Sequence, residues 1–169
     1  RNGQVHRAAG AAAGREHLGE AFQGFIQINL NPVLYPKGTH AAHAMAHQLG
    51  GFYNLPHGEC NAILLPIVEE YNLLAHLDKF INIARMMDEN IDGLSKRDAA
   101  ELAISAIRRL SQDVGIPASI TELAKRYGKE VSRSDIPTMV ANAQKDACGL
   151  TNPRKMTDAA VQQLYEIAF

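Results

Sequence analysis

Apolar residues recur at helical spacing along most of the chain after its first forty residues. The clearest case begins at Ser95, where apolar residues three and four positions apart would line one face of an α-helix. Ser95 and Asp98 form a capping-box pattern that predicts the start of this helix, and Gly115 with Pro117 predicts its end. The apolar face consists of Ala99, Leu102, Ala103, Ala106, Ile107, Leu110 and Val114.

The same reasoning predicts helices in most of the remaining sequence. Glycine tolerates the left-handed conformation at a helix end, so Gly50 and Gly51 are expected to end the first helix, and "FYNLPHGE" is expected to be a loop. Pro66 must kink the second helix or start a fresh turn. No convincing strand pattern follows residue 40, which predicts an all-α fold. The expected helices span 40–50, 59–72, 76–88, 95–114, 119–127 and 136–147, with a last helix from 157 onward.

The first part of the chain has a different composition. Residues 1–18 are rich in alanine and glycine without a clear apolar period, which predicts weak helix or disorder. Residues 25–38 contain strand-favouring residues interrupted by Pro32 and Pro36, which predicts irregular structure.

Composition and charge narrow the range of functions. A chain of 169 residues, 46% apolar and 21% charged, is long enough for one globular domain with its own core. A net charge of -1 gives no electrostatic footprint for nucleic acid or an anionic membrane, and no apolar run could span a bilayer. Two distant cysteines, Cys60 and Cys148, without a signal peptide predict a reduced, cytoplasmic protein. The first residue, Arg1, is not methionine, which suggests part of a longer protein.

Four of the seven histidines fall within the eighteen residues "HAAHAMAHQLGGFYNLPH". On a helix, His43 and His47 lie one turn apart on the same face, and His40 is within reach of His43. His57 would approach from the following loop. Neutral imidazole is a common ligand of divalent transition metals, so this segment is a candidate metal site.

The spacing alone leaves two interpretations open. Catalytic zinc and iron sites usually have three or four protein ligands, often including a carboxylate, whereas this segment offers two or three nitrogens. The H-E-x-x-H pattern of metalloproteases is absent because Ala44 stands at the glutamate position, and Glu59 is the only nearby acid. The alternative is that the histidines cap helix ends or lie in surface turns, as is typical of isolated histidines such as His6, His17 and His76.

Longer motifs go beyond this pattern. The stretch "HAMAHQLGGFYNLPHGECNAILLPIVEEYN", residues 43–72, resembles the C-terminal domain signature of the iron-containing (group III) alcohol dehydrogenases. Within that family it is most similar to the branch that includes lactaldehyde reductase and 1,3-propanediol dehydrogenase. The resemblance continues through "IARMM", "DVGIPASITELA" and "DIPTMVANAQKDACGLTNPRK" to the final helix. It implies the all-α C-terminal domain of a dehydroquinate synthase-like fold.

In this family an N-terminal dinucleotide-binding domain precedes the helical domain, and one aspartate and three histidines bind a metal between them. The resemblance implies that His43 and His57 are metal ligands, that His47 is a catalytic residue in proton transfer, and that Cys148 lies near the substrate pocket. The implied cofactors are Fe²⁺ (or Zn²⁺) and NAD(P), the latter bound mainly by the N-terminal domain. The implied partners are a small alcohol or aldehyde and, for a full-length enzyme, further copies of the same chain.

The sequence also departs from the family pattern. The aspartate and histidine expected upstream in a D-A-x-x-H-A motif are absent, as is a glycine-rich phosphate loop after a strand. Residues 1–42 do not resemble the helix that normally leads into the family signature, which divides the chain into a divergent lead-in and a helical metal-binding domain at 43–169. Glu59 occupies a position that is usually small or apolar, and Ile67 replaces a frequent histidine.

The preferred hypothesis is the C-terminal portion of a metal-dependent, NAD(P)-linked alcohol dehydrogenase that interconverts short-chain alcohols or diols and aldehydes. We expect this chain to be inactive alone, because two histidines hold a metal poorly. The first alternative is a non-catalytic helical interaction module that retains the family fold. The second is a metal-dependent hydrolase that uses Glu59 as its base, with Glu59 or His40 as the only candidate for a third ligand.

Overall fold

The computed structural model describes residues 40–169, which fold into packed helices with no strand among them. This confirms the all-α prediction for that part of the chain. The predictions for 1–18 and 25–38, and all but three residues of the lead-in 1–42, lie outside the described residues. In chain order the helices are α4 (Ala41–Tyr53), α5 (His57–Asn72), the 3-10 helix η2 (Leu73–Ala75), α6 (Leu77–Met86), α7 (Lys96–Asp113), α8 (Ile120–Arg126), the 3-10 helix η3 (Arg133–Asp135), α9 (Ile136–Ala143), the 3-10 helix η4 (Ala147–Thr151) and α10 (Asp158–Ala168).

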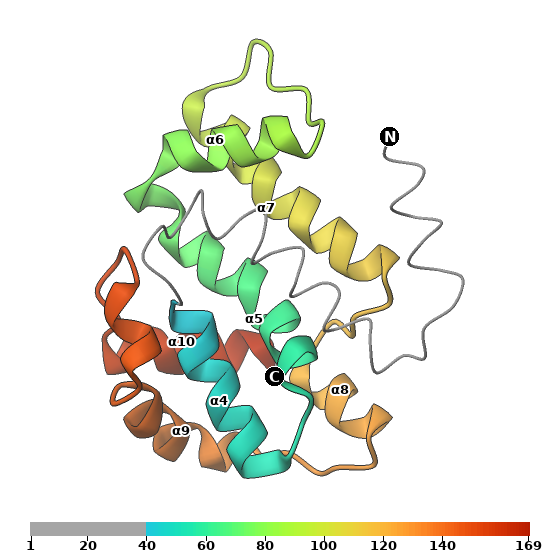
Figure 1. The fold of residues 1–169 in the computed structure, drawn as a ribbon, viewed down its shortest axis with the longest axis vertical. Helices are drawn as coiled ribbons and strands as arrows, with labels where there is room; N and C mark the ends of the chain where they lie inside the picture. Colours follow the sequence, from blue (N-terminus) through green and yellow to red (C-terminus); the bar gives the residue numbers. More distant parts are fainter. Residues whose placement is uncertain (1–39) are drawn as a thin grey trace.

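Helix α5 lies at the centre of the fold, in contact with α4, α7, α8 and α10 (Figure 1). Every residue from Gly58 to Glu69 is buried, and four other helices contact α5. A helix that is apolar around most of its circumference requires such an environment. Pro66 does not interrupt α5, which continues as one helix to Asn72.

Helices α6 and α7 pack on each other on one side of α5, in the upper part of Figure 1. The predicted cap of α7 is confirmed: the Asp98 N–H donates to the Ser95 Oγ (3.2 Å), and the Ser95 hydroxyl donates to the Asp98 carboxylate (2.7 Å). The apolar face predicted for α7 is also confirmed. Four of its positions, Ala99, Ala103, Ala106 and Ile107, are buried, and the partly buried Leu102, Leu110 and Val114 pack against the core.

Helices α4, α9 and α10 and the short η4 pack together on the other side of α5. The Tyr165 hydroxyl, buried in α10, donates to the Met45 carbonyl in α4 (2.9 Å) and ties the last helix to the first described one. Thr157 caps α10 as predicted, since its Oγ1 accepts from the Ala160 N–H (3.2 Å). These contacts hold α4, the helix that carries His43 and His47, in place against α5, α9 and η4.

The boundary between α4 and α5 differs from the prediction. Helix α4 continues through Gly50 and Gly51, and ends where Asn54 adopts the left-handed conformation (φ 52°) with its N–H donating to the Gly50 carbonyl (2.9 Å). Asparagine adopts this conformation more readily than most residues other than glycine, so it can end the helix after the glycine pair. Helix α5 then begins at His57, so the expected loop shrinks to a tight turn.

The region after α9 also differs from the prediction. Helix α9 ends at Ala143 instead of about 147, and the chain forms η4 where a loop was expected. Asp146 caps η4 by accepting a hydrogen bond from the Cys148 N–H (2.9 Å), and this competes with continuation of α9. Among residues 40–169, the structure contains no helix that is both long and apolar enough to cross a bilayer.

Candidate metal centre

Helix α4 positions two histidines one turn apart, as its periodicity predicts. His43 points into the protein and is 7% exposed, whereas the His47 side chain is 42% exposed. Their ring centroids lie 6.5 Å apart with the ring planes nearly perpendicular. One face of α4 therefore carries a buried imidazole, His43, and one turn later an accessible one, His47.

The first turn of α5 brings in the third ring. The tight turn after α4, with Asn54 left-handed and Pro56 extended, sets the start of α5 against α4. The His57 ring centroid lies 5.6 Å from that of His43 and 5.1 Å from that of His47, on which it stacks at 18°. The predicted convergence of His43, His47 and His57 is thus observed, but His57 comes from a helix and not from a loop.

The pKa values of the buried His43 and the half-buried His57 keep both rings neutral. Burial, followed by the neighbouring His57 and His47, lowers the pKa of His43 to about 4, and Asp146 offsets only part of this. Burial and then His47 also lower the pKa of His57. Both rings are therefore neutral at neutral pH, which is the state that a metal ligand requires.

The separation of the His43 and His57 rings fits two ligands of one ion. A metal–nitrogen bond of about 2.1 Å places an imidazole centroid about 3.2 Å from the ion, so two tetrahedral ligands have centroids about 5 Å apart. The observed 5.6 Å is close to that value. The Asn61 side-chain amide lies 2.9 Å from the His57 Nε2, where it can donate to a nitrogen with a free lone pair. A cation can take the place of that donor.

His47 makes a hydrogen bond that the sequence analysis missed. Its Nδ1 lies 2.7 Å from the Asp146 Oδ2, although the two residues are 99 positions apart. Burial would raise the pKa of Asp146, but hydrogen bonds from His47 and from the Cys148 N–H together lower it. An ionised carboxylate can only accept, so Nδ1 carries the proton and Nε2 presents the lone pair. We refer to His43, His47, His57 and Asp146 as the histidine corner.

His40 lies outside this corner and has a structural role. It is buried at the N-cap of α4, where its Nδ1 accepts from the Ala42 N–H (3.3 Å) and lies 3.6 Å from the Glu69 Oε1. Burial, followed by the neighbouring His43, lowers the pKa of His40 to about 3, so the ring is neutral. For this histidine the helix-capping interpretation is therefore correct.

Glu59 is also occupied elsewhere. Its buried carboxylate accepts hydrogen bonds from Arg126 (3.1 Å) and from the Tyr127 hydroxyl (2.6 Å), both at the C-terminal end of α8. A carboxylate held in this way is turned toward α8 and is not available as a base. The hydrolase alternative loses the residue on which it depended, and the unusual glutamate is explained as an anchor between α5 and α8.

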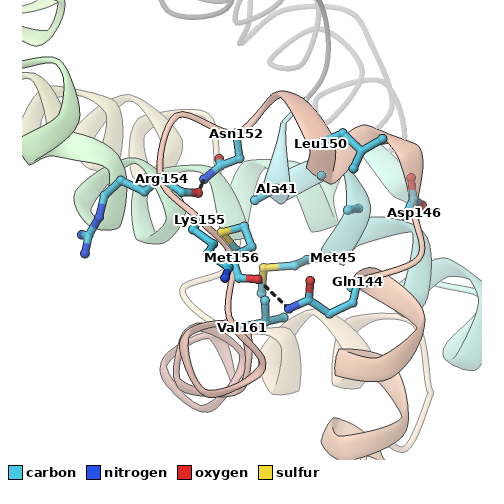
Figure 2. A pocket seen from close by; sticks show the side chains of 13 residues that line it. Ala41, Met45, Gln144, Asp146, Leu150, Asn152, Arg154, Lys155, Met156 and Val161 are labelled. Carbon is cyan, nitrogen blue, oxygen red and sulfur yellow. Dashed lines mark hydrogen bonds between the residues drawn. The ribbon is translucent and has the colours of Figure 1, made fainter.

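A cavity of about 210 Å³ adjoins α4 on the side of η4. Figure 2 shows Met45, Gln144, Met156 and Val161 around it, with Asp146 at one side. A water molecule fills about 30 Å³ in the liquid, so the space accommodates a small organic molecule. Cys148 lies half-buried in η4, close to this region but not on the cavity wall.

Comparison with known proteins places this arrangement in context. Residues 34–169 match the model of the Fe-containing alcohol dehydrogenase family, C-terminal part. The chain is 50% identical to 1,3-propanediol dehydrogenase from Citrobacter freundii over 127 residues, which is 75% of this chain and 31% of the relative. It is 36% identical to lactaldehyde reductase from Escherichia coli K12 over 168 residues, which is 95% of this chain and 40% of the relative.

Two further comparisons add another enzyme and a solved structure. NAD-dependent methanol dehydrogenase from Bacillus methanolicus is 37% identical over 131 residues, 78% of this chain and 33% of the relative. A crystal structure of 1,3-propanediol oxidoreductase superposes with a TM-score of 0.72 at 48% identity, over 77% of this chain and 32% of that chain. The chain therefore spans between 31% and 40% of the length of these relatives.

Proposed function

The chain belongs to the Fe-containing alcohol dehydrogenase family, and on that premise we propose that residues 43–169 are the metal-binding domain of an NAD(P)-linked oxidoreductase. Its reaction interconverts short-chain alcohols or diols and aldehydes. The observation that carries this proposal is the convergence of three histidine rings from α4 and α5, with His43 and His57 at a separation that suits one ion. Packing alone does not require neutral buried imidazoles to face one another, which favours the enzyme over a non-catalytic module.

In the proposed site His43 and His57 hold a divalent cation, Fe²⁺ or Zn²⁺, through neutral imidazole nitrogens. Such a cation supplies Lewis-acid polarisation of an alcohol or carbonyl oxygen. Two protein nitrogens are fewer than the three or four of a stable catalytic site. The remaining ligands and the dinucleotide site are assigned to the N-terminal part of the full enzyme.

The proton is assigned to His47. Asp146 accepts from its Nδ1 and holds the ring with Nε2 as the nitrogen that takes or gives a proton. The His47 side chain is 42% exposed and can therefore exchange a proton with solvent more readily than His43, which is 7% exposed. Positioned acid–base groups of this kind contribute about 10²–10⁴-fold to a rate.

The substrate is assigned to the region between α4 and η4. The cavity there has the volume for a short alcohol or aldehyde, and Asp146 connects its wall to His47. Cys148 lies in η4 between the wall residues Asp146 and Gly149 but not on the wall itself, and it is proposed to contact the part of the substrate that reaches η4. Residues 40–169 contain no strand and hence no strand–turn–helix phosphate site, so we expect the described domain alone to form no NAD(P)H.

A fusion tests this assignment. The N-terminal domain of the Citrobacter freundii 1,3-propanediol dehydrogenase is joined ahead of residue 43, and alcohol-dependent NAD(P)H formation is followed by absorbance. We expect activity in the fusion and none in the isolated chain. His43→Ala and His57→Ala should lose bound iron and activity together, whereas His47→Gln should keep iron and lose activity. Iron-loaded, folded fusion protein that oxidises no short alcohol or diol would refute the proposal.

A further inference from the structure

We propose that His47, Asp146 and Cys148 form a binding site for a zinc-like divalent cation, with a ligand set that does not include His43 or His57. One nitrogen, one carboxylate oxygen and one sulfur from these residues all lie within 4.8 Å of one another. It is the only such group of three found among residues 40–169. The chemistry, the rigidity and the accessibility of the three residues each support the site.

The donor set selects the ion. A thiolate, an imidazole and a carboxylate together favour zinc and similar borderline-soft ions over Mg²⁺ or Ca²⁺, which prefer oxygen ligands throughout. Zinc ligands at about 2.0–2.3 Å from the ion lie about 3.5 Å from one another. The Nδ1 of His47 and the Oδ2 of Asp146 are 2.7 Å apart, and the three donor atoms lie within 4.8 Å of one another. Binding therefore needs the hydrogen-bonded pair to open by about 0.8 Å and the thiol to approach by at most about 1.3 Å.

The backbone holds two of the ligands in register. The Asp146 Oδ1 accepts from the Cys148 N–H (2.9 Å), which fixes the carboxylate at the start of η4 and leaves Oδ2 directed at His47. Helix η4 packs directly on α4: a Cβ at Gly149 would lie 3.8 Å from the Ala44 Cβ, at a point one turn before His47. The three donors therefore project from two segments in close contact.

An ion can reach this site from solvent. The side chains of His47 and Asp146 are 42% and 17% exposed, and Cys148 is half-buried. Cys60, in contrast, is fully buried and its pKa is raised to about 12, so it stays a thiol. On binding, the His47 Nδ1 proton and the Cys148 thiol proton leave to solvent, and two metal–ligand bonds take their place. Water fills the fourth position, as in other zinc sites with three protein ligands.

Occupancy would have a functional consequence that rests on the proposed function. An ion at this site would be bound by the Nδ1 of His47 and by the Asp146 carboxylate, which otherwise orients the His47 ring. It thereby removes the tautomer on which the proposed proton transfer depends, so we expect a zinc-like ion here to inhibit turnover. The existence of the site does not depend on that role of His47.

Cobalt titration of the 169-residue chain tests the site, because Co²⁺ replaces zinc and gives a thiolate-to-metal absorption band only when sulfur is a ligand. We expect this band to rise to one equivalent and to disappear on addition of Zn²⁺. It should vanish in Cys148→Ser and need at least about tenfold more cobalt in Asp146→Asn and His47→Gln. It should persist in Cys60→Ala, in His76→Ala and in the double variant His43→Ala/His57→Ala.

Three outcomes would overturn the proposal: no thiolate band in the parent chain, a band that survives Cys148→Ser, or a band that is lost in the His43→Ala/His57→Ala double variant. The last would mean that Cys148 completes the ion site of His43 and His57. Circular dichroism of each variant identifies those that fail to fold, and for these Cys148→Ala and Asp146→Ser are used instead. Activity of the fusion enzyme tests the proposed dehydrogenase function, and the cobalt band tests the cation site. Failure of one therefore leaves the other to be judged by its own experiment.

Discussion

The α6–α7 pair and the histidine corner are held together by different interactions. Helices α6 and α7 meet through apolar side chains at helical spacing, with most of their polar residues at caps or on exposed faces. The histidine corner instead gathers titratable groups from α4, α5 and the start of η4. Burying such groups destabilises the folded protein unless each finds a partner, whereas burying apolar surface stabilises it.

This difference separates stability from function. The α6–α7 pair contributes to the core and has no cluster of potential ligands among the described residues. Within the histidine corner, burial lowers the pKa values of His43 and His57, so these two rings stay neutral, which is costly in acid but suitable for binding a cation. Substitutions in the pair should therefore alter unfolding, and substitutions in the corner should alter metal binding.

The largest effect on stability is expected from Phe80→Ala in α6. Phe80 is 1% exposed, and truncation of a buried phenylalanine typically costs about 3–5 kcal/mol through lost apolar burial and the remaining cavity. Chemical denaturation should show this loss in the free energy of unfolding. The control Leu74→Ala, at a 62% exposed position in η2, should change it by at most about 0.5 kcal/mol. Similar values for both variants would show that burial of Phe80 does not stabilise the α6–α7 pair.

The next effect is the pH dependence at the buried end of α4. The pKa of His40 is about 3 in the folded protein and 6.5 ordinarily, so between these values the unfolded chain binds a proton that the native protein does not. The free energy of unfolding therefore has its full value above pH 6.5 and decreases as the pH falls toward 3. His43 contributes in the same direction. The slope is at most about 1.4 kcal/mol per pH unit for one histidine.

Urea unfolding at pH values of about 7, 6 and 5 measures this slope. We expect His40→Gln to give a shallower pH dependence than the parent chain, because the substituted residue does not titrate. His76→Gln, at an exposed position, should leave the slope unchanged. An equal slope in the His40 variant would show that its burial does not control acid sensitivity.

A smaller effect is expected where Glu59 anchors α5 to α8. Glu59→Gln keeps the volume but removes the charge that accepts from Arg126 and Tyr127, so we expect a loss of about 2 kcal/mol in the free energy of unfolding. The matched control Glu70→Gln breaks the exposed ion pair with Arg108 and should cost about 0–1 kcal/mol. Equal losses would mean that burial adds nothing to the Glu59 contacts.

Local sequence patterns predicted most of the helices, because helix caps and apolar periodicity act over a few residues. Ser95, Ser119 and Thr157 cap the helices that they were expected to start. The least accurate boundaries were at Gly50 and after Ala143, where a left-handed asparagine and the cap of η4 by Asp146 decide the outcome. In both places two local conformations compete, and the hydrogen bond that caps the helix end decides between them.

The sequence by itself determined that His43 and His47 share one face of a helix, since that follows from 3.6 residues per turn. Only the tertiary structure decided that Asp146 meets His47 across 99 positions, that Glu59 turns away to Arg126, and that His40 is buried as a cap. The physical reason is that spacing specifies neighbours along a helix, whereas contacts between distant segments depend on how whole helices pack.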